Sequence, residues 1–510
     1  MILTQNNKTA LLSIQQMYAA DRAAMAGGTP GTALMDAAGA AVARAIRLRW
    51  RPRPTVILCG PGNNGGDGFV AASYLKQAGW PVIVSLFGLP EGLPPDARAA
   101  YDDWCRLCLE AGVGNATVSF EPSCLSNAGL IVDALFGAGL QRPLGGVAAD
   151  VVEAAVSQVA QTGIPVVAVD MPSGMNGNTG QVDGAVLPAD VTVTFFRGKT
   201  GHHLHPGAAL CGTLVVADIG IPATVLHEIT PTVAVNDPVL WREALPVPQP
   251  DGHKYDRGHV LVLAGAMPGA AVLAARAAAR AGAGIVTLGQ FLPAKVESSS
   301  AFQVAIPASL ITANFSSVEQ LLQFCRDRKV QTIVLGPGFG RNADSARIIA
   351  EILQDQPNCI LDADGISAFA GLPYGLDRMI GPETVLTPHA GEFSRIIPVD
   401  PDSAEPGKLA RTVAAAARFR ATIVHKGADT IVASADGQAI INANGPAYLA
   451  SAGTGDVLAG LIGGLRAQGM AAFAAAAAAV WLHADAAHRV GAGLIADDLP
   501  DAIPESFQSL

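Results

Sequence analysis

A glycine-rich loop near residue 60 carries the first side chains that could do chemistry. The run Gly60-Pro-Gly-Asn-Asn-Gly-Gly-Asp-Gly68 lies between an apolar segment and a helical one. Glycines at such a turn let the backbone approach a phosphate at a helix start. Asn63, Asn64 and Asp67 add three oxygen-bearing side chains, which suit a hard cation or a ribose. No Gly-Lys-Ser/Thr follows, so this is not a Walker loop, and a tight structural turn is the alternative.

Aspartates end two further apolar segments of the first half. Asp133 lies near the end of LIVDAL, and Asp170 ends VVAVD. Ligands of parallel α/β sheets bind just beyond the carboxyl ends of the strands. We therefore expect both aspartates to lie close to the glycine-rich loop. An ordinary helix or turn cap is the alternative for Asp133.

Four loops of the second half each follow an apolar segment and combine glycine with polar residues. They are Gly336-Pro-Gly-Phe-Gly340, Leu386-Thr-Pro-His-Ala-Gly-Glu392, Lys426-Gly-Ala-Asp-Thr430 and Gly453-Thr-Gly-Asp456. Gly453 and Gly455 would expose N–H groups at the positive end of a helix, and Asp456 could act there as acid or base. A capping role is the alternative for Asp456, and a purely structural one for His389. We expect His425, inside an apolar strand, to belong to the core.

Alternating strands and helices must position these loops. Such alternation predicts an α/β fold with parallel sheets covered on both faces. The expected strands are residues 55–59, 81–87, 130–135, 166–170 and 191–196, then 260–263, 332–335, 360–361, 385–386 and 422–424. The expected helices beside the two glycine loops are residues 69–78 and 456–468. A proline-broken stretch, 223–250, predicts a linker between a domain of residues 1–222 and one of residues 251–510. No motif recurs at a fixed offset, so the two domains are different.

Composition excludes several functional classes. The 510 residues are 50% hydrophobic and 15% charged with net charge −10, which argues for globular domains and against a nucleic-acid binder. The longest uncharged apolar run, 470–482, is shorter than the ~20 residues that span a bilayer, so we expect a buried helix. Seven scattered cysteines and a start without signal-peptide features predict a reduced, cytoplasmic protein. We expect His202, His203 and His205 to lie on a solvated loop.

The motifs of the first half resemble those of the NAD(P)H-hydrate epimerase domain (YjeF N-terminal type). Asn63-Asn-Gly-Gly-Asp67, Asp133-Ala-Leu-Phe-Gly-Ala-Gly-Leu-Gln-Arg142 and Asp170-Met-Pro-Ser-Gly174 occur in that order, after helical segments 16–22 and 34–39 that also fit. The resemblance implies a Rossmann-like parallel-sheet domain and a potassium site formed by Asn64, Asp133 and Ser173. It implies hydrate binding by Asn63, Asn64, Gly65, Gly66, Asp67, Gly137, Ala138, Gly139, Leu140, Gln141, Arg142, Pro143 and Asp170.

Epimerisation of a carbon that bears a hydroxyl beside a ring nitrogen requires that the carbon–nitrogen bond open and close again on the other face. A positioned carboxylate, Asp170, could shuttle the proton. We expect Lys199, in the run Phe195-Phe-Arg-Gly-Lys199, to be its cationic partner.

The four loops of the second half resemble the ribokinase-like ADP/ATP-dependent NAD(P)H-hydrate dehydratase. The resemblance implies a ribokinase-like α/β domain with Asp456 as the catalytic residue. It implies hydrate binding by Gly269, Ala270, Gly338, His389 and Asp456. It implies binding of the AMP part of the nucleotide by Lys426, Gly427, Ala428, Asp429, Thr430 and Gly455.

Together the two resemblances cover nearly the whole chain in the order of a fused, bifunctional repair enzyme. They imply small-molecule substrates (NADHX, NADPHX and ADP or ATP), with Mg²⁺ at the nucleotide and K⁺ at the epimerase site. We expect a homo-oligomer that binds neither nucleic acid nor membrane. The alternatives are a ribokinase-like small-molecule kinase fused to a nucleotide-binding scaffold, and a non-enzymatic scaffold in the first half. The polar residues kept at the first site, and the acidic charge, disfavour the scaffold.

Overall fold

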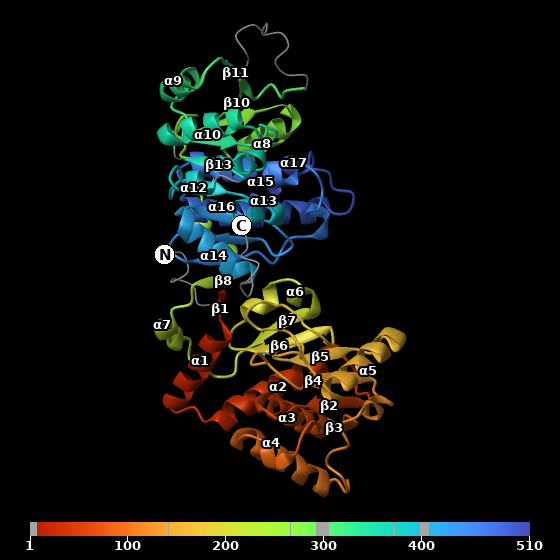
Figure 1. Ribbon diagram of the computed structural model, residues 1–510. Helices are drawn as coiled ribbons and strands as arrows, with labels where there is room; N and C mark the ends of the chain where they lie inside the picture. Colours follow the sequence, from red (N-terminus) through yellow and green to blue (C-terminus); the bar gives the residue numbers. More distant parts are fainter. Residues whose placement is uncertain are drawn as a thin grey trace. The chain divides into compact units, whose positions relative to one another are not determined.

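The computed structural model describes residues 8–140, 142–265, 267–291, 305–356, 358–370, 373–397 and 407–510. The chain divides into two compact units, in which Ala10–Val233 form the N-terminal one and Ala234–Leu510 belong to the C-terminal one. Each unit is built on a largely parallel sheet with helices on its faces (Figure 1). The α/β class expected from the alternation of strands and helices is confirmed.

The N-terminal unit contains a six-stranded sheet in the order β3-β2-β4-β5-β6-β7. All of its neighbouring strands run parallel. Its strands are β2 (Thr55–Cys59), β3 (Val82–Leu86), β4 (Leu130–Ala134), β5 (Val166–Val169), β6 (Val191–Phe195) and β7 (Thr213–Ala217), and a short β1 (Ala10–Leu11) precedes them. The chain passes from β2 outward to β3 and then returns to place β4 on the other side of β2. Such a reversal opens a crevice at the carboxyl ends of β2 and β4, where parallel sheets bind ligands.

Helices cover both faces of this sheet because successive strand residues point to opposite sides. Ile57 packs into a core shared with α1 to α4, whereas Val56 packs into a second core shared with α5. The helices are α1 (Ile14–Ala26), α2 (Gly31–Arg49), α3 (Asn63–Gln77), α4 (Pro95–Glu110), α5 (Val147–Thr162), α6 (Gly207–Leu210) and α7 (Leu226–Ile229).

The stretch expected as a linker, residues 223–250, is not an extended connector. It contains α7 and the strand β8 (Val233–Val235), followed by two short 3-10 turns. Trp241 is 1% exposed, and its Nε1 donates to Asn236 Oδ1 at 3.0 Å. Asn236 Nδ2 in turn donates to Asn442 Oδ1 at 2.9 Å. Ala234, Leu240 and Trp241 therefore join the core of the C-terminal unit, whereas Val225 and Leu226 join a core of the N-terminal unit.

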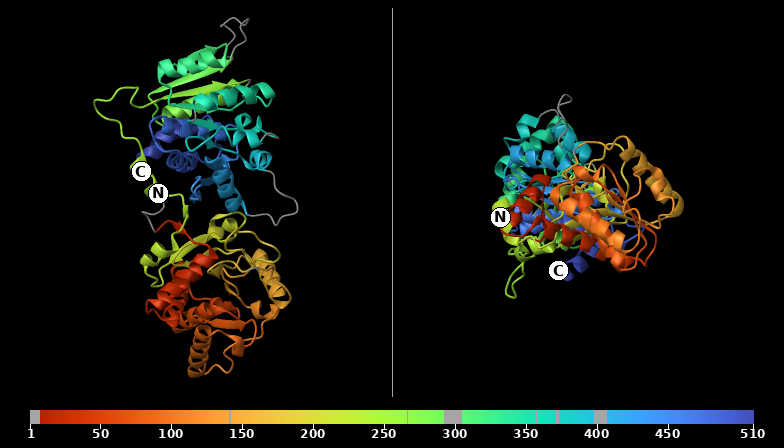
Figure 2. Two further views of the ribbon diagram at one scale, coloured as in Figure 1. Left: turned by 60° about the vertical axis from the view of Figure 1, so that its left-hand side comes forward. Right: turned by 90° about the horizontal axis from the view of Figure 1, so that it is seen from below.

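The C-terminal unit continues with a large sheet in the order β17-β16-β15-β14-β13-β12-β9-β10-β11. The pairs from β15 to β11 are parallel, and β16 and β17 are antiparallel additions. Its strands are β9 (His259–Ala264), β10 (Ile285–Phe291), β11 (Ile311–Phe315), β12 (Thr332–Leu335), β13 (Cys359–Leu361), β14 (Val385–Leu386), β15 (Thr422–His425), β16 (Ile431–Ala433) and β17 (Ala439–Ile441). β10 and β11 form the upper edge in the left-hand view of Figure 2. The chain reverses direction across the sheet between β9 and β12, which again opens a crevice at carboxyl ends.

Alanine-rich helices form the core over one face of this sheet. A Cβ at Gly460 would lie 2.0 Å from the carbonyl oxygen of Ala274, so glycine allows α15 and α8 to pack closely. The helices are α8 (Pro268–Arg280), α9 (Val318–Arg328), α10 (Ala343–Asp355), α11 (Asp364–Ser367), α12 (Pro373–Leu376), α13 (Ala390–Ile396), α14 (Lys408–Phe419), α15 (Thr454–Ala467), α16 (Ala472–Val490) and α17 (Leu499–Gln508). The apolar run at 470–482 lies mostly in α16, which is largely buried, as expected. Among the described residues, no helix has the length and hydropathy needed to cross a membrane.

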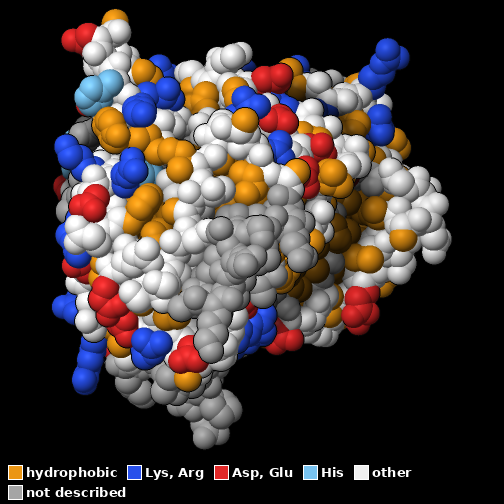
Figure 3. All heavy atoms as spheres, turned by 90° about the horizontal axis from the view of Figure 1, so that it is seen from above, with side chains coloured by type: hydrophobic (Ala, Val, Ile, Leu, Met, Phe, Trp, Pro, Cys, Tyr) orange, Lys and Arg blue, Asp and Glu red, His pale blue; other side chains and the backbone are white. Residues whose placement is uncertain are grey.

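Charged residues make up 15% of the sequence. On the face drawn in Figure 3, acidic and basic side chains are interspersed with apolar ones. The seven cysteines are free thiols.

Candidate active sites

The glycine-rich loop of the N-terminal unit is largely the start of a helix. α3 begins at Asn63, six residues before the start that the sequence pattern predicts. A Cβ at Gly60 would lie 1.7 Å from the carbonyl oxygen of Leu135, and one at Gly65 would lie 2.0 Å from that of Gly60. Because β2 and β4 are neighbours, the loops after them touch, and only glycine fits there. The same glycines that look like a loop in the sequence therefore allow close packing of a helix.

Asp133 and Ser173 form a buried pair that joins the loops after β4 and β5. Ser173 donates to Asp133 twice, from Oγ to Oδ1 at 2.6 Å and from the backbone N–H to Oδ2 at 2.8 Å. The N–H of Leu135 donates to Oδ1 at 3.2 Å, so Asp133 also closes a local turn. Burial raises the pKa of Asp133, and the hydrogen bonds from Ser173 and Leu135 oppose that rise.

Asp170, the first residue after β5, has a backbone φ of +65°, which non-glycine residues rarely adopt. Its Oδ1 accepts from Lys199 Nζ at 2.6 Å and from Thr194 Oγ1 at 2.9 Å. Its Oδ2 accepts from the N–H of Ala138 at 2.9 Å. Burial would raise the pKa of Asp170, but Lys199, His202 and the hydrogen bonds outweigh it and hold the pKa at about 2. The Lys199 side chain is 2% exposed, so the expected ion pair is a buried one.

His202 does not lie on a solvated loop, contrary to expectation. It is 3% exposed and ends a 3-10 turn over Thr200–His203. Its Nδ1 accepts from the N–H of Lys199 at 3.0 Å, and its Nε2 lies 2.9 Å from the carbonyl oxygen of Asp170. Burial, followed by the charge of Lys199, lowers the pKa of His202 to about 3, so the ring is neutral and supports the two catalytic candidates. His203 is half-buried and His205 is exposed.

A cavity of about 530 Å³ opens at the crevice between β2 and β4. The residues expected from the sequence that line it are Asn63, Asn64, Asp67, Gly137, Ala138, Gly139, Leu140, Asp170 and Lys199. Gly65 and Gly66 are buried in helix packing, and Arg142 and Pro143 are exposed outside the lining. Gln141 lies outside the described residues.

Several residues that line this cavity were not assigned from the sequence, and two of them are Tyr18 and Asp21 on α1. A Cβ at Gly139 would lie 2.2 Å from Tyr18 Oη, so the phenol lies directly against that loop. Burial raises the pKa of Asp21 to about 6, with Asp170 adding to the rise and Lys199 and Arg22 opposing it. Both residues lie in the helical segment 16–22, which resembles the family. That resemblance is the sequence signal that could have identified them.

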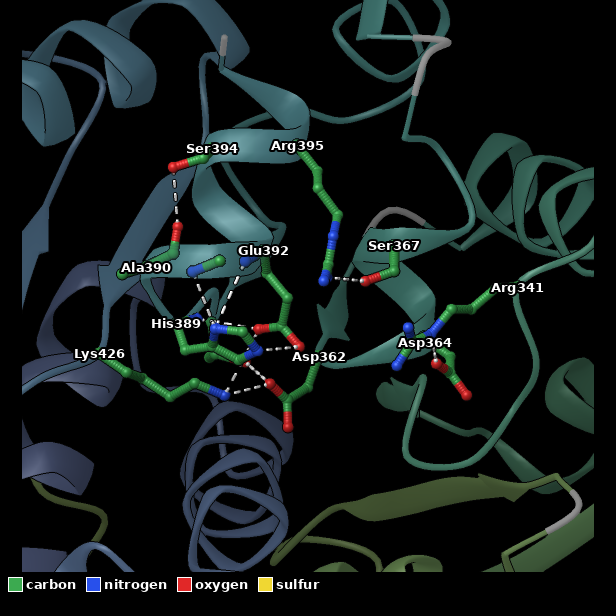
Figure 4. Close-up of polar contacts among 12 residues, drawn as sticks. Arg341, Asp362, Asp364, Ser367, His389, Ala390, Glu392, Ser394, Arg395 and Lys426 are labelled. Carbon is green, nitrogen blue, oxygen red and sulfur yellow. Dashed lines mark hydrogen bonds and ion pairs between the residues drawn. The ribbon is translucent and has the colours of Figure 1, made fainter. Parts of the chain in front are cut away.

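The site of the C-terminal unit centres on Lys426, which follows β15. Its Nζ donates to Asp362 Oδ1 at 2.7 Å and lies 4.0 Å from Glu392 Oε2. Thr387 Oγ1 donates to the same Asp362 oxygen at 2.7 Å. Burial would lower the pKa of Lys426, but Asp362 and Glu392 outweigh burial and raise it. Figure 4 shows Asp362, Glu392 and Lys426 converging from separate elements, with the Arg341–Asp364 ion pair to one side.

His389 is both a helix cap and part of this group. It precedes α13, where its Nδ1 accepts from the N–H of Gly391 at 3.0 Å. Its backbone N–H donates to Glu392 Oε2 at 2.9 Å, and its Nε2 lies 3.3 Å from Glu392 Oε1 (Figure 4). Because 55% of the His389 side chain is exposed, the structural role leaves the ring open to a ligand. His425 is 4% exposed and stacks on Phe393, so it belongs to the core, as expected.

Asp456 lies in the first turn of α15, which begins at Thr454, two residues before the predicted start. The N-cap residue is Gly453, with φ +89° and no side-chain cap bond, so Asp456 does not cap the helix. A Cβ at Gly455 would lie 3.3 Å from Lys426 Nζ, which places the lysine against the helix start. Burial, followed by the charge of Asp362, raises the pKa of Asp456 to about 7 although Lys426 opposes the rise.

The remaining predicted residues divide into two groups. Asp429 and Thr430 hold the loop after β15, since Asp429 pairs with Lys408 at 2.5 Å and Thr430 Oγ1 donates to the carbonyl of Gly427 at 2.8 Å. Gly338, with φ +66°, approaches Met267 so closely that its Cβ would lie 2.5 Å from that side chain. This contact brings Gly338 beside the start of α8, which holds Gly269 and Ala270. Asp362 and Glu392 were not assigned from the sequence, although both follow strands that it predicted.

Comparison with known proteins accounts for both units. The model of the YjeF-related protein N-terminus matches residues 31–201, and that of NAD(P)H-hydrate dehydratase matches residues 260–508. A bifunctional NAD(P)H-hydrate repair enzyme from Thermofilum pendens is 35% identical over 496 residues, covering 94% of this chain and 92% of the relative. This chain belongs to the bifunctional NAD(P)H-hydrate repair enzyme family. Another member, from Moorella thermoacetica, is 34% identical over 508 residues, covering 94% and 93% of the two chains.

A solved structure is also similar to about half of this chain. The ADP/ATP-dependent NAD(P)H-hydrate dehydratase of Bacillus subtilis, co-crystallised with ATP and Mg²⁺, is 28% identical with a TM-score of 0.44. The match covers 52% of this chain and 95% of the Bacillus subtilis chain. Membership of the family confirms the resemblance that the sequence motifs indicated.

Proposed function

We propose that this protein restores hydrated NADH and NADPH to the intact cofactors. The N-terminal unit interconverts the R and S forms of the hydrate, and the C-terminal unit dehydrates the S form with ADP, releasing AMP and phosphate. The observation that carries the proposal is that one chain of this family holds two separate polar sites. One lies at the crevice between β2 and β4, and the other lies beyond the carboxyl ends of β13, β14 and β15. A dehydratase specific for the S form leaves the R form unrepaired. A fused epimerase converts the R form into the S form.

In the N-terminal unit we assign hydrate binding to the cavity of about 530 Å³. The helix start at Asn63 and the loop from Gly137 to Leu140 present backbone N–H groups to a phosphate-bearing ligand. The Asp170–Lys199 ion pair supplies fixed charges beside the reacting ring.

Potassium fits the residues that the family resemblance assigns to it. Asn64, Asp133 and Ser173 offer an amide, a carboxylate and a hydroxyl, and oxygen donors with one negative charge suit a weakly binding monovalent ion. Asp133 is fully buried, and its partners in the described part of the chain are neutral donors. Asn64 Nδ2 is buried without a partner in the described residues. A bound cation would offset the buried charge and order these loops.

In the C-terminal unit we assign the general base to Asp456. The carboxylate would accept the hydroxyl proton of the hydrate as its oxygen attacks the terminal phosphorus of ADP. Phosphate then leaves with electron donation from the ring nitrogen, and loss of a proton from the adjacent ring carbon forms the carbon–carbon double bond of NAD(P)H. Lys426 and the N–H groups at the start of α15 would neutralise the transferring phosphoryl group.

We assign the remaining ligand contacts as the family resemblance implies. His389, Gly338 and the start of α8 (Gly269 and Ala270) would contact the hydrate, whereas the loop Lys426 to Thr430 and Gly455 would hold the AMP part. Magnesium would arrive with the nucleotide phosphates, for which Asp362 and Glu392 offer carboxylate oxygens. Since NAD(P)H and ADP are intracellular metabolites, we place the protein in the cytoplasm, and we expect a homo-oligomer.

The test offers purified protein a mixture of R and S hydrate with ADP, or with ATP, and follows the absorbance of NAD(P)H. Conversion of the whole mixture supports both activities. Conversion that stops at the S fraction, after correction for slow spontaneous epimerisation, contradicts the epimerase assignment. A stable phosphorylated product would instead identify a small-molecule kinase.

A further inference from the structure

The carboxylate of Asp170 has little capacity left to move a proton. A carboxylate carries about four lone-pair positions. Three donors already occupy it, namely Lys199 Nζ at 2.6 Å, Thr194 Oγ1 at 2.9 Å and the N–H of Ala138 at 2.9 Å. Protonation of Asp170 would disrupt these bonds and strand the buried Lys199 charge. Asp170 is therefore suited to remain ionised throughout the reaction.

Asp21 lines the same cavity, but its carboxylate differs from that of Asp170 in its hydrogen bonding. Its carboxylate makes no hydrogen bond or ion pair within the described part of the chain. The helix that carries it is firmly placed, because Ser13 caps α1 and Met17, Ala20 and Ala24 are buried. An unpartnered carboxyl on a fixed helix facing a ligand cavity is available to exchange a proton with that ligand.

From this difference in bonding we propose that Asp21 is the residue that moves the proton during epimerisation, and that Asp170 is a fixed anion beside it. The inference rests on the proposed epimerase activity of the N-terminal unit. The hydroxyl proton of the hydrate passes to Asp21 while the bond between the hydroxylated carbon and the ring nitrogen breaks. The electron pair of that bond goes to the nitrogen, and the carbon becomes an aldehyde. Asp21 then gives the proton to the nitrogen.

Ring closure repeats these steps in reverse after the aldehyde has rotated to present its other face. The nitrogen attacks the aldehyde carbon and returns its proton through Asp21 to the oxygen. No atom or electron is gained or lost, so a single carboxyl can serve both directions. Microscopic reversibility then requires the same group to act on both epimers.

The charged surroundings of Asp21 support this role. The groups that face it are Lys199, Asp170, Asp67 and Arg22, with the phenol of Tyr18 beside it. Burial and Asp170 raise the pKa of Asp21, Lys199 and Arg22 lower it, and the balance is about 6. The pKa of Asp170 is about 2. A group whose pKa is close to the working pH transfers protons most effectively, which favours Asp21.

The test follows the appearance of R hydrate from pure S hydrate without nucleotide, from pH 4.5 to pH 8, with the spontaneous rate subtracted. For the wild-type chain we expect the rate to rise through about pH 6 as Asp21 loses its proton. Asp21→Asn should lower the rate ~10²–10⁴-fold and abolish the rise. Asp96→Asn, which removes another carboxylate from the cavity lining, should keep the rise. ADP-dependent dehydration of S hydrate by the same Asp21→Asn protein reports that its C-terminal unit is folded.

The outcomes separate the two proposals. Absence of any epimerisation by the wild-type chain overturns the proposed function itself. A wild-type rate that is constant from pH 4.5 to pH 8, or a rise near pH 6 that persists in Asp21→Asn, overturns the role of Asp21 alone. If Asp21→Asn does not fold, the wild-type profile still decides, because transfer by Asp170 would show no rise in this range.

Discussion

Replacing Asp456 by asparagine should reduce dehydration while making the protein more stable. The change keeps the shape of the side chain and removes its negative charge. Because the N-cap of α15 is Gly453, no capping bond is lost. If Asp456 had a purely structural role, the variant would keep its turnover and lose stability. The two roles can therefore be distinguished in one variant.

The size of the stability effect follows from the pKa of Asp456. Burial, with Asp362 adding to it, raises that pKa from 3.8 to about 7. The native state therefore binds the proton more tightly than the unfolded chain, and the free energy of unfolding falls as the pH rises from about 4 to about 7. The difference corresponds to at most about 4 kcal/mol above pH 7. An interaction with the helix dipole of ~0.3–1 kcal/mol is lost in exchange. Asp456→Asn should thus raise the free energy of unfolding by a few kcal/mol at pH 8 and leave it unchanged below pH 4.

The catalytic effect follows from loss of the base. We expect turnover of S hydrate with ADP to fall ~10²–10⁴-fold, with little change in ADP affinity. In the wild-type chain the rate should rise through about pH 7, because only ionised Asp456 accepts the proton.

Three measurements on each protein check this reasoning, namely NAD(P)H absorbance, ADP binding by calorimetry and chemical unfolding at pH 4 and pH 8. Asp344→Asn is the matched control, since Asp344 also lies in the first turn of a helix of this unit but is 85% exposed. It should change neither turnover nor stability. Turnover of Asp456→Asn within a factor of about three of the wild type would refute the assignment of the general base.

Three further predictions concern the other assignments. The intact chain should convert a mixture of R and S hydrate completely in the presence of ADP, which NAD(P)H absorbance measures against a pure S standard. Asp133→Ala should abolish epimerisation and its stimulation by KCl while sparing dehydration of pure S hydrate; an equal loss of both would mark a structural role for the whole chain. Gly455→Ala should weaken ADP binding without unfolding the protein, because the added methyl group would lie 3.3 Å from Lys426 Nζ, and calorimetry with thermal unfolding would show it.

The fold class could be predicted from the sequence because buried parallel strands are continuous apolar runs. The expected strand at 55–59 coincides with β2. Candidate site residues such as Asp170 and Lys426 directly follow strands, as predicted. The boundaries of two helices were less predictable. α3 and α15 start within runs of glycine that read as loops. The glycines at α3 allow close packing, whereas Gly453 before α15 adopts a positive φ of +89°. Helix propensity ranks glycine low, and only the neighbouring backbone explains its use there.

The sequence by itself determined which groups can react. Local motifs at strand ends and helix starts identify Asp133, Asp170 and Asp456, because each such motif depends on only a few consecutive residues. Tertiary structure alone decided how those groups behave. The strand order brings Lys199 to Asp170 and places Asp21 in the same cavity, although they lie far apart in the chain. Burial and neighbouring charge then set three aspartates at pKa values of about 2, 6 and 7. Desolvation and Coulomb forces act through space, so no spacing along the chain encodes them.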